Sequence, residues 1–120
     1  MGITTIVVVS VPVTNQDRAK AFYVDVLGFE PRRESPFGDG QRWVEVAPPA
    51  GGPSLVLVTW FPTMPAGSVT GLVLGCDDVD ATYAELAARG VVFKGAVESA
   101  PWGRFATFDD PDGNGWVLQG

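Results

Sequence analysis

The sequence predicts an α+β fold built from two tandem βαβββ modules. Fifteen glycines and ten prolines separate short apolar runs, which is typical of many short strands joined by turns. The chain also repeats itself, because four pairs of residues recur at one constant separation. The pairs are Gly28 and Gly90, Arg42 and Arg104, Pro49 and Pro111, and Gly51 and Gly113. We therefore expect a single domain over residues 1–120, with module 1 at 1–62 and module 2 at 63–120.

Module 1 opens with a β-branched run at residues 3–13, which predicts its first strand. Asn15 then offers a helix start, and apolar residues recur at helical spacing until Gly28 ends the helix. Apolar segments bounded by turn residues predict the remaining strands. These segments are 29–34, 41–47 and 54–60.

Module 2 follows the same order. An apolar run at 69–76 predicts its first strand, and Asp77 or Asp78 caps a helix that ends before Gly90. The remaining strands are expected at 91–98, 104–109 and 116–119, with a hairpin turn at 110–115. With the helices on the outer face, we expect a curled mixed sheet whose other face encloses a ligand cleft.

Composition excludes several functions. A net charge of −6 and scattered basic residues argue against a nucleic-acid partner. The apolar run at 6–9 is too short to cross a bilayer, and the start of the chain lacks the features of a secretory signal. Cys76 is the single cysteine and no histidine exists to activate it, so we expect a buried apolar side chain. These features predict a cytoplasmic protein without a membrane partner.

Three segments resemble the vicinal-oxygen-chelate superfamily, the glyoxalase/bleomycin-resistance/dioxygenase family. Residues 17–29 are similar to its first helix motif, A-x-x-F-Y-x-x-x-L-G-F. Residues 77–90 are similar to its second helix, and residues 108–114 to its D-P-D-G-N hairpin. The resemblance covers essentially the whole chain and implies the same tandem fold.

The superfamily includes isomerases, dioxygenases, thiol transferases and proteins that sequester antibiotics. Its enzymes hold a divalent metal with one His or Glu from each of four strands. The resemblance places those positions at Val8, Leu57, Gly71 and Val117, and none of these side chains can coordinate a metal. A carboxylate site for a hard cation is the alternative, although turns and helix starts explain most of the aspartates. We therefore expect no metal and no cofactor.

Strand alternation predicts which side chains line the cleft. On the strand at 41–47 the valines suit the core, which leaves Trp43 and Glu45 for the cleft. The repeat gives the matching places in module 2 to Phe105 and Thr107. The predicted ligand-binding residues are Phe37, Trp43, Glu45, Leu57, Thr59, Trp60, Met64, Trp102, Phe105, Thr107 and Gln119. By contrast, Trp116 and Phe22 are expected in the core.

These residues favour a metal-independent binding protein for a small aromatic molecule. The resemblance implies self-resistance by sequestering an antibiotic or natural product of the bleomycin, enediyne or polyketide type. It also implies a homodimer with ligand clefts at the interface. One alternative is a metal-independent lyase or isomerase that uses Glu45, the one candidate catalytic residue, as its acid or base. Another is a plain dimerisation module, in which the aromatic residues fill an interface.

Overall fold

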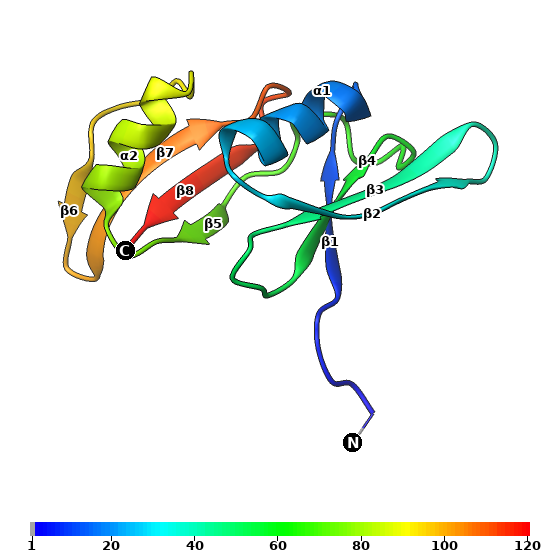
Figure 1. Ribbon diagram of the computed structural model, residues 1–120, viewed down its shortest axis with the longest axis horizontal. Coiled ribbons are helices and arrows are strands. Elements are labelled where there is room, and N and C mark those ends of the chain that lie inside the picture. The colour runs from blue at the N-terminus through cyan, green and yellow to red at the C-terminus, as the bar shows by residue number, and fades with distance from the viewer. Residues whose placement is uncertain (1) are drawn as a thin grey trace.

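The computed structural model describes residues 2–120 and contains two four-stranded sheets, each with a helix against one face (Figure 1). Module 1 comprises β1 (Val8–Pro12), α1 (Gln16–Ala21), the π-helical segment η1 (Phe22–Val26), β2 (Glu30–Phe37), β3 (Gln41–Ala47) and β4 (Ser54–Val58). Module 2 comprises β5 (Leu72–Gly75), α2 (Val79–Ala88), β6 (Glu98–Ala100), β7 (Gly103–Asp109) and β8 (Gly115–Gln119). The predicted α+β class and tandem βαβββ order are confirmed.

Both sheets have the same topology. The strand order is β1-β4-β3-β2 in the first sheet and β5-β8-β7-β6 in the second. The first strand of each module pairs in parallel with the last strand of that module, and the other pairs are antiparallel. Strands β1 and β5 are therefore the equivalent edges of the two sheets.

Equivalent contacts fix the start of each helix. The side chain of Asn15 accepts a hydrogen bond from the backbone of Arg18, and Asp78 accepts one from Ala81, both at 3.0 Å. Asp78 is therefore the N-cap of α2, one of the two predicted candidates. An arginine of the third strand then binds an aspartate in the first helical turn. Arg42 lies 2.9 Å from Asp17, and Arg104 lies 2.8 Å from Asp80.

Some elements differ in extent from the prediction. β1 begins at Val8, and residues 2–7 form an arm outside the sheet in which Ile3 is 95% exposed (Figure 1). The first helix widens at its end, because the backbone N–H of Leu27 donates to the carbonyl of Phe22, five residues earlier. The strand expected at 91–98 is reduced to an isolated bridge between Phe93 and Phe108, and β6 begins only at the end of that range.

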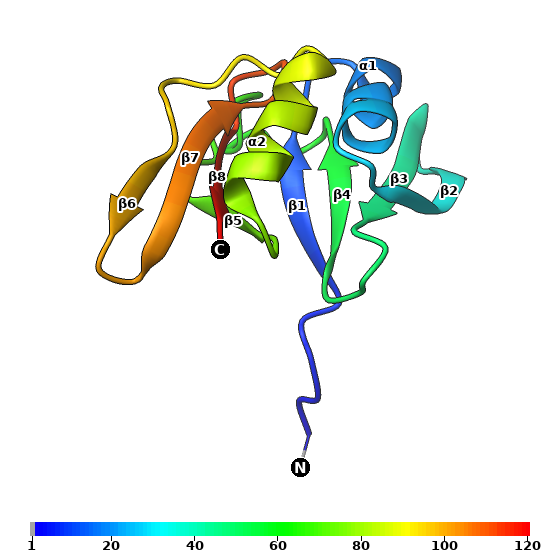
Figure 2. The same ribbon diagram turned by 60° about the vertical axis from the view of Figure 1, so that its left-hand side comes forward.

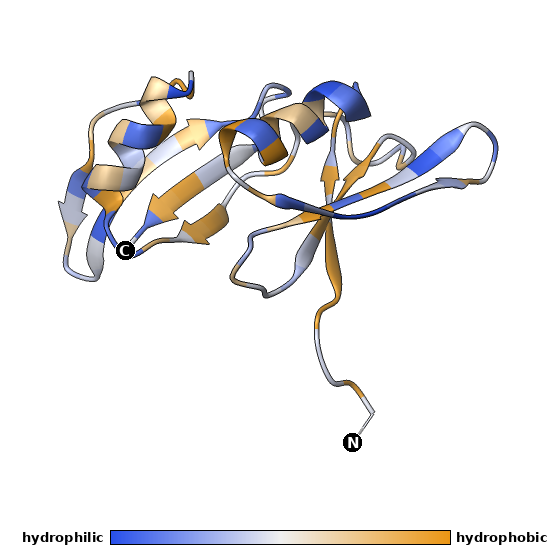
Figure 3. Ribbon diagram, in the orientation of Figure 1, coloured by the Kyte–Doolittle hydropathy of each residue, from blue (hydrophilic) through white to orange (hydrophobic). Residues whose placement is uncertain are grey.

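The two modules share one hydrophobic core on the helix side of both sheets. Val44 and Val46 of β3, Tyr23 of η1, and Phe108 and Trp116 of the second sheet belong to the same cluster. In Figure 2, α1 and α2 lie toward the middle of the molecule, with β2 and β3 on one side and β6 and β7 on the other. The outer part of the β2–β3 hairpin is hydrophilic, whereas β5 and the start of β1 are hydrophobic (Figure 3). The helix-covered faces therefore meet at the shared core, and the uncovered faces point away from it.

A buried polar network joins the modules inside this core. The hydroxyl of Tyr23 donates to Asp110 at 2.6 Å and accepts from the indole N–H of Trp116 at 3.0 Å. Asn114 donates to the carbonyl of Pro12 at 2.8 Å and to Asp110 at 2.9 Å. Burial raises the pKa of Tyr23 well above its ordinary value, and the charge of Asp110 raises it further. Within residues 2–120, no helix has the length and apolarity needed to span a membrane.

Candidate functional site

Strand β3 separates core residues from residues on the uncovered face of the first sheet. Val44 and Val46 are buried in the core, whereas Trp43 and Glu45 alternate with them and are half-buried. The register between β3 and β4 supports this assignment. Val46 lies opposite Leu55, which belongs to the core, and Glu45 lies opposite Val56, the next residue of β4. We call the uncovered face that carries Phe37, Trp43, Glu45 and Trp60 face A.

Aromatic rings form a continuous cluster on face A. The ring of Phe37 lies 4.7 Å from that of Trp60 and 6.1 Å from that of Trp43, between ring centroids. Phe61 extends the cluster at 6.1 Å from Trp60. Phe37 and Phe61 are 40% and 44% exposed, so the cluster presents apolar area to the outside. Such a surface can stack against a flat aromatic molecule.

Two charged groups border the Trp43 ring on face A. The indole N–H of Trp43 donates to Oε1 of Glu45 at 2.9 Å. The guanidinium carbon of Arg33 lies 5.8 Å from the centre of the Trp43 ring, and Arg33 lies opposite Glu45 in the β2–β3 register. Sequence reasoning missed Arg33, because a register shift between Pro31 and Arg33 decides which residue of β2 lies opposite Glu45.

The uncovered face of the second sheet carries the matching aromatic pair. Phe105 lies opposite Gln119 in the β7–β8 register, and Thr107 lies opposite Val117. The ring of Trp102 lies 5.2 Å from that of Phe105 at an interplanar angle of 31°, and Trp102 is 60% exposed. We call the surface formed by Trp102, Phe105, Thr107 and Gln119 face B.

A shallow pocket of about 180 Å³ adjoins Thr107 on the second sheet. Lys94 and Asp109 line it and form an ion pair at 3.0 Å. Thr70 and Gly71 also line it. Face B therefore combines the exposed Trp102 and the half-buried Phe105 with a small recess that contains one ion pair, whereas face A has more aromatic rings and two charges.

Three further predicted residues lie elsewhere. Leu57 is fully buried in the core, and Gln16 donates to its carbonyl at 2.7 Å, so the expectation that it lines the uncovered face is wrong. The physical reason is that β4 is apolar at all but its first position, and its register gives the uncovered face to Val56. Thr59 is exposed just beyond the end of β4, and Met64 is half-buried in the following loop.

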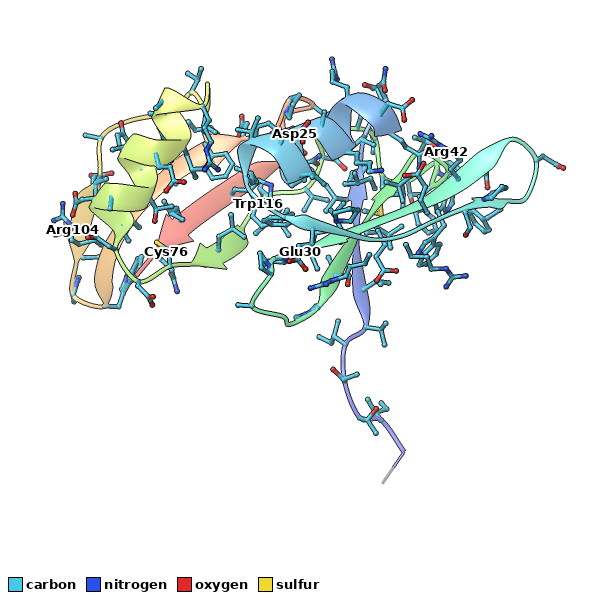
Figure 4. The ribbon with its side chains drawn as sticks, in the orientation of Figure 1. Asp25, Glu30, Arg42, Cys76, Arg104 and Trp116 are labelled. Carbon is cyan, nitrogen blue, oxygen red and sulfur yellow. The ribbon has the colours of Figure 1, made fainter. Side chains whose placement is uncertain are left out.

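The space between the two modules is lined by a different set of residues. A cavity of about 500 Å³ lies there, on the helix side of both sheets, and the eleven predicted ligand-binding residues are absent from its lining. Leu27, Leu55, Leu74 and Trp116 line it, together with the half-buried Cys76. Figure 4 places Trp116 between the modules, with the repeat-related Arg42 and Arg104 at opposite ends of the molecule. Faces A and B therefore do not converge within one chain.

The positions that resemble metal-ligand positions do not fit a divalent ion. Val8, Gly71 and Val117 have no side-chain nitrogen, oxygen or sulfur atom that could coordinate a metal, and the apolar side chain of Leu57 lies in the core. Among residues 2–120, no group of three or more Cys, Asp or Glu side chains could hold a metal. No catalytic step through a metal follows from these residues.

Residues 5–118 match the family model of the Glyoxalase/Bleomycin resistance protein/Dioxygenase superfamily. The structure is similar to that of TnmS3, an antibiotic binding protein from Streptomyces sp. CB03234. The two share 50% sequence identity and a TM-score of 0.92, over 99% of this chain and 97% of that chain. A superfamily member from Sphaerobacter thermophilus DSM 20745 is 33% identical with a TM-score of 0.92, over 99% of this chain and 98% of that one. The uncharacterized protein YetH of Bacillus subtilis (strain 168) is 35% identical over 92% of this chain and 93% of its own length.

Proposed function

This chain belongs to the glyoxalase/bleomycin resistance protein/dioxygenase superfamily, and we propose that within it the protein binds and sequesters a flat aromatic small molecule without a metal. The single observation that carries this proposal is the partly exposed aromatic cluster of Phe37, Trp43 and Trp60 on face A, with the Trp102–Phe105 pair in the matching place on face B. Exposed rings of this kind are costly in water unless they meet a partner. Stacking on a planar molecule would remove that area from water.

A homodimer would complete the site. In one chain the two faces point away from each other, so neither can enclose a ligand alone. A two-fold axis that sets face A of one protomer against face B of its partner generates two identical clefts. A ligand held between both faces loses more of its surface to protein than one resting on a single sheet, which favours tight binding.

The ligand class follows from the chemistry of the faces and from the relatives. The faces offer aromatic rings, a carboxylate, a guanidinium and a few hydroxyl and amide groups, which suits a polycyclic natural product with polar substituents. TnmS3 is an antibiotic binding protein at 50% identity, which supports an antibiotic as the ligand. We therefore propose self-resistance by sequestration of a bleomycin-, enediyne- or polyketide-type compound in the cytoplasm.

Tryptophan fluorescence tests this proposal. Titration with a soluble planar aromatic, anthraquinone-β-sulfonate, should quench the wild-type emission at micromolar concentrations. Trp60→Ala on face A and Trp102→Ala on face B should each weaken binding about fivefold, because each loses one stacking contact. Val92→Thr is the matched control, since Val92 is an apolar side chain that is 85% exposed and outside both faces.

Two results would contradict the proposal. The first is the absence of quenching and of binding heat with the wild-type protein at the highest soluble probe concentration. The second is chemical conversion of the probe during incubation, because a sequestering protein returns its ligand unchanged.

A further inference from the structure

Face A carries two charged side chains whose arrangement the proposed function does not specify. Arg33 and Glu45 lie opposite each other as a cross-strand pair between β2 and β3. The guanidinium of Arg33 lies over the Trp43 ring, and Glu45 accepts from the indole N–H of Trp43. A purely apolar stacking surface would need neither charge. Charged groups beside an aromatic cluster have a desolvation cost when a ligand covers them, unless the ligand offers partners.

Within the part of the chain that the structure describes, Arg33 has unused hydrogen-bond donors, and Glu45 has an unused hydrogen-bond acceptor. Trp43 uses one carboxylate oxygen of Glu45, and Oε2 has no hydrogen bond to another described residue. Among residues 2–120, the ion pairs of the other arginines involve Asp or Glu side chains, whereas Arg33 forms no such pair. Arg33 therefore keeps hydrogen-bond donors, and Glu45 keeps an acceptor, beside the aromatic cluster on which a flat ligand would stack.

From this geometry we infer that face A selects planar aromatic ligands that carry a hydrogen-bond donor and a carbonyl acceptor side by side on one edge. The donor of the ligand binds Oε2 of Glu45, and its carbonyl binds the guanidinium of Arg33, while the ring system packs on Trp43 and its aromatic neighbours. Amino- and hydroxyquinones have this pattern. The inference rests on the proposed function, because it specifies which ligands the same face binds.

Two probes that differ in a single group test it by isothermal calorimetry. Anthraquinone-β-sulfonate has the carbonyl without the donor, and its α-amino derivative adds an amine next to that carbonyl. The wild-type protein should bind the amino derivative about tenfold more tightly, since charge-assisted hydrogen bonds contribute at this scale. Arg33→Met should weaken binding of both probes, because both present the carbonyl.

Glu45→Gln should abolish the preference for the amino derivative while the simpler probe still binds. The amide oxygen would stay on the indole N–H of Trp43, and the amide NH₂ would then face the amine of the ligand, donor against donor. Glu85→Gln is the matched control, because Glu85 lies on α2 and is paired with Arg89, away from both faces. That control should keep the tenfold preference.

The failures are distinguishable. If both probes bind the wild type equally, or if Glu45→Gln keeps the preference, the inference is overturned and the proposed function stands. If neither probe binds the wild type, the proposed function itself fails and the inference fails with it.

Discussion

At the scale of single residues, the environment of Tyr23 makes folding stability depend on pH. Its side chain is fully buried, and its hydroxyl lies between the Asp110 carboxylate and the Trp116 indole. Burial and the nearby negative charge both disfavour the phenolate, so they raise the pKa of Tyr23 in the folded state. The unfolded chain has the ordinary value near 10.0, and the difference makes folding stability depend on pH.

We predict the pH dependence that follows. Below pH 10 both states keep the proton, and the contribution of Tyr23 to stability is fully present. Above pH 10 the unfolded chain loses the proton while the folded state keeps it, so the free energy of unfolding falls by about 1.4 kcal/mol per pH unit. Tyr23→Phe should remove this fall, at a cost of about 1–3 kcal/mol at neutral pH because the buried Asp110 loses a donor.

Urea denaturation between pH 9 and 12 measures the free energy of unfolding of the wild type and of Tyr23→Phe. The difference between the two proteins isolates Tyr23, because every other group titrates in both. Tyr83→Phe is the control, because its hydroxyl donates to the carbonyl of Gly95 instead of to a carboxylate. A parallel pH dependence in the wild type and in Tyr23→Phe would contradict the account.

At the scale of elements, the turn at residues 110–115 connects the modules. Asn114 is fully buried, donates to the carbonyl of Pro12 at the end of β1, and accepts from the backbone of Val69 before β5. Asp112 accepts from the backbone and hydroxyl of Thr14 and from Arg18. Within module 2, the backbone of Gly67 also approaches Asp112 so closely that a β-carbon on Gly67 would clash with the carbonyl of Asp112. One turn of module 2 therefore binds module 1 through several independent contacts.

We predict that Asn114→Ala lowers the free energy of unfolding by about 2–4 kcal/mol, because several buried polar groups lose their partners together. Chemical denaturation should still show one transition, since the modules share a core. Asp39→Ala, in the exposed β2–β3 turn, should change stability by less than about 0.5 kcal/mol. Two separate transitions in the wild type would contradict the shared core.

The elements also show what the sequence could and could not predict. On β3, alternation between valines and polar or aromatic residues predicted the placement of Trp43 and Glu45. On β4, four consecutive apolar residues carry no alternation, so the side of Leu57 depended on the β3–β4 register. The π-helical segment at the end of the first helix contains Tyr23, whose ring packs against Trp116 of module 2, and no local sequence pattern predicts that contact.

At the scale of the whole molecule, the repeat predicted matching ligand-binding residues in the two modules and placed them in one cleft, whereas the structure carries them on two separate sheets. Each module buries its helix side, and the two helix sides together form one core. That packing turns faces A and B away from each other and leaves a separate cavity between the modules. A ligand that contacts both faces must therefore contact two chains, as the proposed function requires.

Complementation between two defective variants tests whether one ligand contacts two chains. Trp43→Ala damages face A and keeps face B, whereas Trp102→Ala damages face B and keeps face A. Each purified variant should bind anthraquinone-β-sulfonate weakly. After the two are mixed and allowed to exchange subunits, about half of the dimers are mixed, and each mixed dimer has one cleft with both faces intact. The account predicts that calorimetry then recovers a fraction of sites with wild-type affinity. A sedimentation experiment in which the protein is monomeric would contradict the proposed homodimer. So would a mixture that binds the probe no better than either variant alone.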